Sequence, residues 1–498
     1  MAVLAPARRR ESRVLLAATL ANGPVELLDF LLPLWAGAAL GASATQVGAL
    51  VAAELAVSVV VRPFAGMLAD ACERRFVAAA GALIYALSCL GYALAGGLPQ
   101  AYAAAVLGGL GGALLWVAVR AMAGERLAED SAVYPRLTAA EETGAWVAFV
   151  AGLSLLSLFG YRTVFLACAG ACLAAAVALA SAPRRVVPAA PELPGGVARR
   201  LRPMLLAVLV TMAAEAAIAL LLLLHLQRHF QLEIVQIAYV FLPGAIAMAV
   251  LPVHLHRFVL RFGRVRVLAL ASISSAVFAT GLAWAPHPVV IALLWVLSGV
   301  AWAAVIPVQQ AVVAEASGAR VGRGMGLYES AVLLGSLAGS LLAGTLYDVS
   351  PWPVACLALA VIILAGAGLV PWSVRALGVA DRPAPADRPA RADRPASVVP
   401  PEQRVEVRTD PRPKPARSAG RKLGEHVALY LAVQAVLAVL DLSWVRDLAT
   451  GAVDPLSGQR DVPLEGLAGI AYGAGRVWTI IVVIDVIWTA VTVFRQRR

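Results

Sequence analysis

The chain has 498 residues, of which 61% are hydrophobic and only 14% are charged. Soluble domains have about 25% charged residues, and a soluble protein of this length could not bury so much apolar surface. Composition therefore predicts an all-α polytopic membrane protein. The net charge of +11 would also suit a nucleic-acid-binding protein. However, the arginines cluster between apolar runs without a basic, aromatic-interleaved stripe, so we expect no nucleic-acid partner.

The cysteines are five in number and scattered, and most lie inside apolar runs: Cys72, Cys89, Cys168, Cys172 and Cys356. Their spacing matches neither a disulfide framework nor a metal site. We therefore expect no cofactor and no bound metal.

Apolar runs long enough to cross a bilayer recur along the whole chain. A crossing helix needs about 20 mostly apolar residues, because the hydrocarbon core is about 30 Å thick. Twelve such runs precede residue 375 and two follow it, which predicts fourteen spans. Their expected positions are 14–39, 46–69, 76–97, 101–122, 140–159, 162–182, 203–226, 235–257, 266–285, 288–313, 325–346, 352–373, 426–444 and 468–494.

Arginine clusters fall in every second loop of this arrangement. They precede the first span, separate spans two and three, four and five, six and seven, eight and nine, and ten and eleven, and end the chain at residues 495–498. The opposite loops, such as 96–100 and 284–288, are short and nearly uncharged. By the positive-inside rule both termini are cytoplasmic, so we expect a multi-pass protein of the cell (cytoplasmic) membrane that contacts membrane lipids.

Two segments divide the chain into regions. Residues 183–202 contain four prolines and separate an N-terminal six-helix half, 1–182, from a C-terminal six-helix half, 203–374. Residues 375–423 repeat the pentapeptide ADRPA at 380–384, 386–390 and 392–396, which predicts a disordered, Pro/Arg-rich cytoplasmic linker. Residues 424–498 then form a predicted two-helix transmembrane hairpin module.

The loop between spans two and three reads Gly66-Met-Leu-Ala-Asp70-Ala-Cys-Glu-Arg74-Arg75. A glycine here allows close helix packing, and an acid at position 70 can cap a helix and pair with a cation. The segment resembles the G-x-L-a-D-r-x-G-r-[RK] signature of the major facilitator superfamily, although Glu73 stands where the family usually has glycine. The resemblance implies a twelve-helix, 6+6 transporter core in which Gly66, Asp70, Arg74 and Arg75 form a conformational latch.

Three further segments resemble family patterns at the corresponding spans. They are residues 261–266, Arg-Phe-Gly-Arg-Val-Arg, whose upstream acid is missing; residues 161–165, Tyr-Arg-Thr-Val-Phe; and the small-residue pattern of residues 324–344. Small residues four apart let helices approach closely. The resemblance covers about residues 13–375.

Two features of the drug/proton antiporter branch are absent. Span four lacks an arginine ahead of its glycines at 108–112, where Ala104 and Ala105 stand, and span five has no Gly-Pro pair. Arg120 lies later in span four. It either substitutes for the missing arginine as part of the latch or extends to the membrane surface.

Ionisable side chains within spans cost about 2.5–3.5 kcal/mol on insertion scales, so they are candidate functional residues. Asn22, Glu26 and Asp29 follow one another at helical spacing and share one face of span one. Two carboxylates one turn apart repel each other, which favours binding of a proton. We expect this face to line a water-filled cavity; a satisfied polar pair near the end of the span is the alternative.

Further polar candidates lie in other spans. Glu54 is in span two, Glu215 is in span seven, and Glu329 opens span eleven, where it is either functional or an interfacial acid. Gln309 and Gln310 follow Pro307 in span ten, and either bind substrate or satisfy a kinked backbone.

The C-terminal helix pair carries Asp441 and Asp485 within its predicted spans and Arg476 near the second. The pair resembles small two-helix membrane modules. It is a packing accessory, an oligomerisation unit or a binding site for a partner.

These observations predict a secondary active transporter, proton-coupled, that exports a small organic molecule by alternating access. Glu26, Asp29 and Glu215 would bind and release the protons. The same fold could instead flip a lipid or glycolipid. A membrane enzyme or sensor is disfavoured, because no metal motif, nucleophile elbow or phosphate loop is present.

Overall fold

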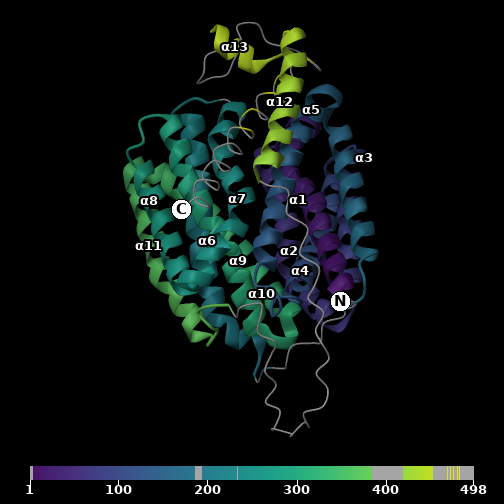
Figure 1. Ribbon diagram of the computed structural model, residues 1–498, viewed down its shortest axis with the longest axis vertical. Helices are drawn as coiled ribbons and strands as arrows, with labels where there is room; N and C mark the ends of the chain where they lie inside the picture. Colours follow the sequence, from purple (N-terminus) through teal and green to yellow (C-terminus); the bar gives the residue numbers. More distant parts are fainter. Residues whose placement is uncertain are drawn as a thin grey trace. The chain divides into compact units, whose positions relative to one another are not determined.

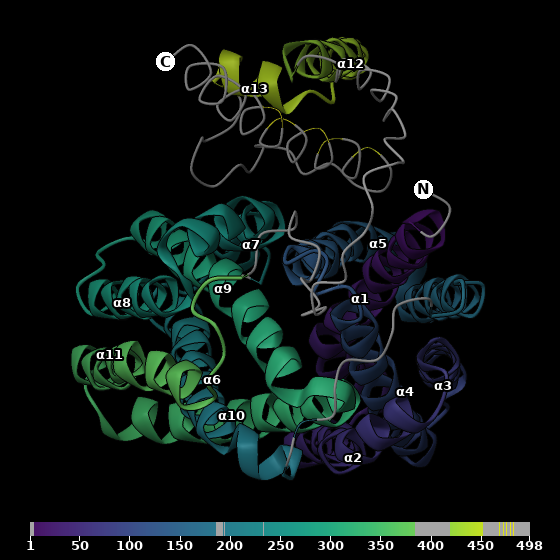
Figure 2. The same ribbon diagram turned by 60° about the horizontal axis from the view of Figure 1, so that its bottom comes forward.

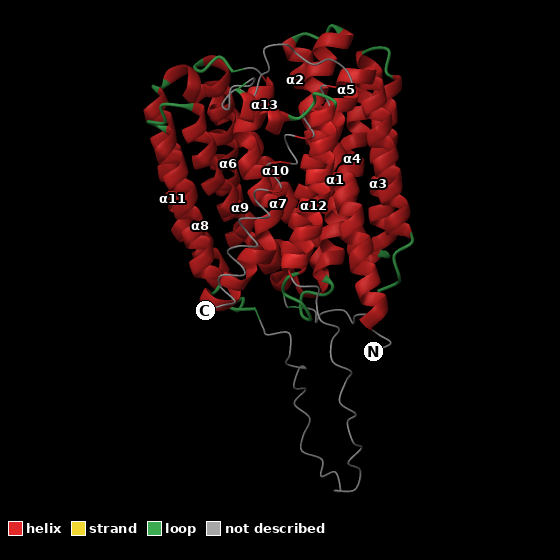
Figure 3. Ribbon diagram, turned by 45° about the horizontal axis from the view of Figure 1, so that its top comes forward, coloured by secondary structure: helices red, strands yellow, loops and turns green. Residues whose placement is uncertain are grey.

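In the computed structural model, the regular secondary structure of the described residues is all helical, with no strand among them (Figure 3). The structure describes residues 4–185, 193, 195–232, 234–383, 419–451, 468, 472, 475, 479 and 482. The chain separates into two compact units, residues 1–388 and 389–498, which are described in turn.

The first half of the large unit contains five helices, α1 to α5, the last of which is interrupted (Figure 1). They are α1 (Leu4–Leu40), α2 (Ala44–Ala71), α3 (Arg74–Leu94), α4 (Leu98–Gly124) and α5 (Val133–Ala180). The Ser43 hydroxyl caps α2 by accepting a hydrogen bond from the Gln46 backbone N–H, and the Gln46 side-chain oxygen accepts one from the Ser43 backbone N–H. This capping box means that the local sequence determines where α2 begins. The helices begin and end within a few residues of the predicted spans, except that α1 and α5 extend further.

Predicted spans five and six are joined within α5. Gly160 interrupts its helical backbone with φ 74° and ψ 178°, a conformation that glycine adopts without strain. The break falls between the two predicted spans, 140–159 and 162–182.

The second half contains six α-helices and one 3₁₀ turn. These are α6 (Val197–Arg228), α7 (Ile234–Phe262), α8 (Arg264–Leu282), α9 (Pro288–Ser317), η1 (Gly318–Arg320), α10 (Val321–Val349) and α11 (Trp352–Ala376). Helix α6 begins inside the segment predicted as the central loop, because the residues after Pro194 contain no further proline until Pro203.

Among the described residues, ten stretches are long and apolar enough to cross a membrane. One of them, Pro288–Val349, contains both α9 and α10, and the part of α5 before Phe159 is not among them. The protein is thus a polytopic helical membrane protein. The total of fourteen spans and the orientation of the termini stay predictions.

The two halves of the large unit lie side by side, with α1–α5 on one side and α6–α11 on the other (Figure 2). Two helix pairs make most of the contact between them: α2 packs against α10, and α5 packs against α7. We call the end of the bundle at which α2, α4, α7 and α9 finish the arginine-rich end.

The start of the predicted linker contacts the start of α8. Asp381, in the first ADRPA repeat, accepts the Val265 N–H at 2.8 Å through its side chain and the Arg264 N–H at 2.7 Å through its carbonyl oxygen. Gly263, with φ 89°, leaves room for this carboxylate at the start of α8. Residues 384–418 lie outside the described part, and the disorder of the linker stays a prediction.

The small unit contains α12 (Ala419–Val439) and α13 (Trp444–Thr450). Gln434 of α12 donates to the Gly475 carbonyl oxygen at 3.1 Å, and Tyr430 lies 2.9 Å from the Thr479 hydroxyl. Asp441 is not within a helix as predicted: it follows α12 with φ 59° and forms an exposed ion pair with Arg446. The predictions for Arg476, Asp485 and most of span 468–494 lie outside the described residues.

Candidate functional site

Helices α2 and α10 cross at backbone contact near the arginine-rich end. A Cβ atom on Gly66 would collide with the Gly322 carbonyl oxygen, and one on Gly322 would collide with that of Gly66. One turn away, a Cβ on Gly326 would collide with the Arg62 carbonyl oxygen. The predicted role of Gly66 in close packing agrees with this geometry, and its partner belongs to the other half of the molecule.

Asp70 caps the first turn of α10 from across this crossing. Its two carboxylate oxygens accept the backbone N–H groups of Gly322 at 2.7 Å and Arg323 at 3.0 Å. A helix N-terminus has free N–H groups and partial positive charge, so a carboxylate there stabilises the helix. Asp70 therefore binds the two halves together in this conformation, and its role as a latch stays a prediction.

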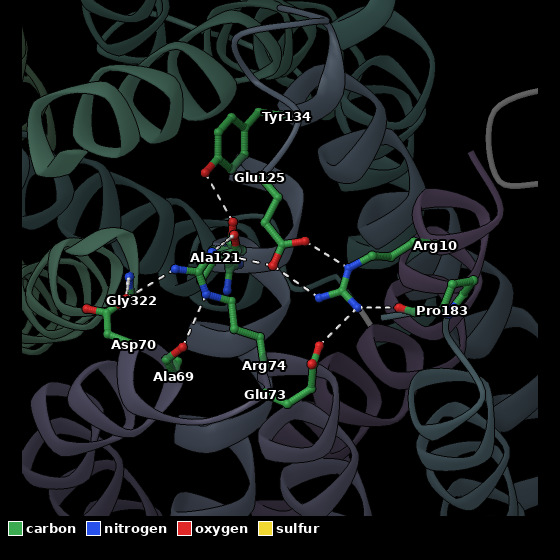
Figure 4. A network of polar contacts seen from close by, with 11 residues as sticks. Arg10, Ala69, Asp70, Glu73, Arg74, Ala121, Glu125, Tyr134, Pro183 and Gly322 are labelled. Atoms are coloured by element: carbon green, nitrogen blue, oxygen red, sulfur yellow. Dashed lines mark hydrogen bonds and ion pairs between the residues drawn. The ribbon is translucent and has the colours of Figure 1, made fainter. Parts of the chain in front are cut away.

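Arg74 and Arg10 share the buried carboxylate of Glu125 at the end of α4 (Figure 4). Arg74 lies 3.5 Å from Glu125 and 3.3 Å from Asp70. Arg10 binds Glu125 through two nitrogens, at 2.8 and 3.1 Å, and donates to the Pro183 carbonyl oxygen at 2.6 Å. This network positions Asp70 from within its own half.

Arg75 contacts the N-terminal half alone in the described structure. It donates to the Ala182 carbonyl oxygen at 2.6 Å, and its guanidinium lies over the ring of Phe76. It ties the start of α3 to the end of α5, so its predicted part in the latch is indirect.

A buried ion-pair cluster lies about two turns before Asp70, toward the start of α2. The carboxylate of Glu329 on α10 forms ion pairs with the guanidinium groups of Arg62 on α2, at 2.6 Å, and Arg120 on α4, at 3.0 Å. Arg120 also lies 3.4 Å from Glu141 of α5 and over the ring of Trp116. Arg120 therefore points into the protein, and Glu329 is a buried inter-half contact instead of an interfacial acid.

The second inter-half crossing, between α5 and α7, has different chemistry. His256 of α7 lies 2.9 Å from the Ser131 hydroxyl, just ahead of α5. The segment upstream of residues 261–266 has no acid like Asp70, and at this crossing the inter-half polar contact is made by a histidine. In the same half, the fully buried Arg264 forms a bidentate pair with Glu315 at 2.5 and 2.7 Å.

An acidic group occupies the N-terminal half between α1 and α2. Glu26 and Asp29 are exposed, and the charges of Glu26 and Glu54 act on Asp29. A Cβ on Gly108 of α4 would lie 2.8 Å from the Glu54 carboxylate. Within the described part of the chain, no ion pair is formed by any of these three acids. The structure thus brings together Glu26, Asp29 and Glu54 as sequence spacing predicted for the first two.

Asn22 differs from the other members of its predicted face. It is buried, and its amide donates to the Glu141 carbonyl oxygen at 3.0 Å. Glycines on both helices bring α1 and α5 into backbone contact here, since a Cβ on Gly144 would collide with Thr19. Asn22 therefore joins α1 to α5 in this conformation.

Glu215 lies inside the C-terminal half. Its carboxylate accepts a hydrogen bond from Ser298 of α9 at 2.8 Å, and it borders a cavity of about 30 Å³ that Gln309 also lines. Gln310 is buried beside Gln309 but does not line this cavity. Both glutamines are almost fully buried, so neither is on an open substrate surface here.

Several buried charges were not predicted from the sequence. Arg62 lies in a predicted span, and the rule that charges within spans are functional would have found it. Glu141 could have been found in the same way, since it lies at the start of predicted span five. Arg10 and Glu125 lie outside the predicted spans, and no signal in the sequence pairs them.

The family model described as Major Facilitator Superfamily matches this chain over residues 14–259 and again over residues 204–484. The chain belongs to the major facilitator superfamily. Its membership makes it a multi-pass secondary transporter and not an enzyme. No curated protein matches this facilitator.

Solved structures share the facilitator fold. The human organic anion transporter MFSD10 (TETRAN) has a TM-score of 0.58 and 20% identity, over 75% of this chain and 99% of that one. The proton:xylose symporter XylE, bound to 6-bromo-6-deoxy-D-glucose, has a TM-score of 0.59 and 15% identity, over 73% and 94%. The E. coli fucose:proton symporter FucP has a TM-score of 0.57 and 16% identity, over 75% and 99%.

Proposed function

We propose that this facilitator is a proton-coupled transporter that exports a small organic molecule across the cytoplasmic membrane. One observation carries the proposal. Glu26, Asp29 and Glu54 lie within spans without ion pairs in the described structure, whereas Glu329 and Glu125 are paired with arginines. The acids in and beside the spans are thus of two kinds, paired with arginine and unpaired, and we assign proton exchange to the unpaired kind.

The physical reason is the cost of an uncompensated charge in a bilayer. An ionised carboxylate at mid-span costs about 2.5–3.5 kcal/mol, and a proton or a cationic group removes that cost. Three nearby carboxylates cannot all ionise cheaply, because like charges repel. Glu26 and Asp29 therefore suit reversible proton binding, and Glu215 offers a further acid in the other half.

The contacts at the arginine-rich end provide the part of the mechanism that concerns the change of conformation. Asp70, Glu329 and the α2–α10 glycines hold the two halves together at this end. Alternating access requires these contacts to separate while the opposite end closes. Support for proton coupling also comes from the fold, which is shared with two proton symporters. Export is the direction that we propose from the resemblance of the set of motifs to those of exporters in the family.

We further propose that the arginine-rich end faces the cytoplasm, because positively charged loops are retained there. Cys72 provides the test, since it is exposed and the other four cysteines are buried. A membrane-impermeant maleimide should label Cys72 only after whole cells are permeabilised, and a Cys72→Ser variant should not be labelled. Labelling of intact cells would reverse the orientation.

Transport is tested with purified protein in liposomes under an imposed pH gradient. A panel of organic cations, anions and sugars is offered, while an internal dye reports proton flux. Substrate-dependent proton movement is expected in the wild type and lost in Glu26→Gln and Asp29→Asn, whereas exchange without a gradient persists in both. Glu129→Gln, an exposed loop residue, is the matched control.

Two results would contradict the proposal. If Glu26→Gln and Asp29→Asn couple protons as the wild type does, then the assignment of these residues is wrong. If none of the soluble compounds moves but a fluorescent lipid analogue changes leaflet in the same vesicles, then the protein is a flippase.

A further inference from the structure

The cavity beside Glu215 lies within the C-terminal six-helix half, not between the two halves. It has a volume of about 30 Å³, and helices α6, α8, α9 and α11 form its wall. Polar groups face it from three of these helices: Thr211, Glu215, Ser272, Ser275, Trp302 and Gln309. Apolar cavities of this kind stay empty, but a polar cavity with room for a water molecule is hydrated.

One hydrogen-bond donor at this cavity, the buried side-chain amide nitrogen of Gln309, has no partner in the described structure. The indole nitrogen of Trp302 is also buried and faces the Glu215 carboxylate, but without a hydrogen bond of good geometry. Gln309 is 0% exposed, so bulk solvent cannot satisfy it. An unmade hydrogen bond of a buried polar group costs about 1–3 kcal/mol, and buried groups of this kind normally have a protein or water partner.

A water molecule fits both the space and the bonding pattern. Its oxygen can accept from the Gln309 amide, and its hydrogens can be donated to the Glu215 carboxylate and a serine hydroxyl. A metal cation fits less well, because the unpartnered Gln309 group is a donor. Waters in proteins make about three such bonds.

Gln309 also contacts α10, the helix that carries the ion pairs between the two halves. Its side-chain oxygen accepts from the Tyr328 hydroxyl at 3.3 Å. The next residue along α10 is Glu329, which binds Arg62 and Arg120 of the other half. Glu215 and the inter-half ion pairs are thus separated by the cavity, Gln309 and Tyr328.

We propose that this cavity binds an ordered water molecule that links Glu215 through Gln309 and Tyr328 to the inter-half ion pairs of Glu329. A change of charge at Glu215 alters the orientation of the water and of the Gln309 amide. This change alters the hydrogen bond between Gln309 and Tyr328, and with it the position of Tyr328 beside Glu329 on α10. The hydration site stands on geometry alone. Its part in coupling rests on the proposed proton-coupled transport.

X-ray hydroxyl-radical footprinting with mass spectrometry tests the water site directly, because radicals formed from a bound water oxidise the side chains beside it. Trp302 should be oxidised faster than Trp295, a tryptophan of the same helix that is partly buried like Trp302 but does not line the cavity. A rate at Trp302 no higher than that at Trp295 would overturn the hydration site.

Two variants keep this test independent of folding defects. Gln309→Leu removes the amide that holds the water and should abolish the excess oxidation of Trp302. Gln310→Leu makes the same change at a residue 1% exposed that does not line the cavity, and should retain it. Both are compared only as monodisperse protein, and equal loss in the two variants would assign the effect to general disruption.

The link to the inter-half contacts is tested by the distance between spin labels in the two halves. Labels at Glu129→Cys and Arg257→Cys, in a Cys72→Ser background, report separation near the arginine-rich end. Glu215→Gln should shift the distance distribution, and Gln309→Leu should suppress that shift while Gln310→Leu preserves it. An equal shift with Gln309→Leu would overturn the link, and since no substrate or gradient is used, failure of transport would leave both results standing.

Discussion

Asp70 on α2 and Gly322 on α10 meet across the boundary between the two halves, where the carboxylate accepts the backbone N–H at 2.7 Å. The contact works only because Gly66 and Gly322 bring the two backbones together. The charge of Asp70, in the N-terminal half, thus lies at the N-terminus of α10, a helix of the C-terminal half. Separation of the halves must expose both groups to water, so this contact favours the state in which the arginine-rich end is closed.

Gly66→Ala should open the arginine-rich end. The added Cβ collides with the Gly322 carbonyl oxygen, and overpacking of this kind costs about 1–3 kcal/mol. This steric cost applies only in the closed state, where the two helices touch. The closed state is therefore destabilised, and spin-label distances should shift toward those of the open state. Gly48→Ala, on the same helix but with open space around it, should leave the distances unchanged; similar shifts in both variants would contradict the steric explanation.

Glu329→Gln should destabilise the protein strongly. It leaves Arg62 and Arg120 buried with a neutral partner, and breaking a buried ion pair from one side costs about 3–5 kcal/mol. Thermal unfolding in detergent should show the loss. The double variant Arg62→Gln and Glu329→Gln should recover part of it, and a double variant less stable than the sum of the two single ones would argue against a direct pair.

Asp381→Ala should destabilise the start of α8. The Asp381 side chain accepts the Val265 N–H, and loss of a helix N-cap costs about 0.5–2 kcal/mol. Hydrogen exchange of amides 264–267, followed by mass spectrometry, should become faster. Arg382→Ala, an exposed neighbour, is the control, and unchanged exchange in Asp381→Ala would mean that the cap does not persist in solution.

Asp130 should give a pH-dependent contribution to stability. Burial alone would raise its pKa, but the Ala132 N–H and the Arg136 guanidinium outweigh burial and hold the pKa below its usual value. Stability from this group is therefore present above the usual aspartate pKa and is lost as pH falls through the lower pKa of the folded state. Because the pair is partly exposed, its worth is about 1 kcal/mol or less.

The measurement for Asp130 compares thermal unfolding of the wild type and Asp130→Asn between neutral and acidic pH. The variant should be less stable near pH 7, and the difference should vanish at the acid end, where the wild-type carboxylate is also neutral. A difference that does not change with pH would assign the effect to packing. Glu129→Gln, its exposed neighbour, is the matched control.

Hydrophobicity and helix spacing were enough to predict most of the helical core. The break at Gly160 falls between two predicted spans, and Glu26 and Asp29 share an exposed face as their spacing indicated. The family-like pattern also singled out Gly66 and Asp70, which contact α10, because both residues lie in one short stretch of sequence. Local periodicity determines which residues share a face, and that information is present in a single helix.

Partners across helices could not be predicted in the same way. Glu329 was found as an acid at the start of a span, but its pairing with Arg62 joins residues far apart in the sequence. Asn22 has the right spacing for a cavity face, yet close packing of α1 against α5 turns it to the Glu141 backbone. Asp381 looked like part of a uniform repeat, and only the left-handed turn at Gly263 distinguishes it.

Arg10 bears on how the protein is made. It lies near the beginning of the chain, and its guanidinium is completed by Glu125 and by the carbonyl oxygen of Pro183, which follows α5. A ribosome must therefore synthesise and insert the whole first half before the first helix can acquire its final neighbours. Until then a strongly solvated arginine remains at the membrane surface, and it anchors that helix in one orientation while the later helices arrive.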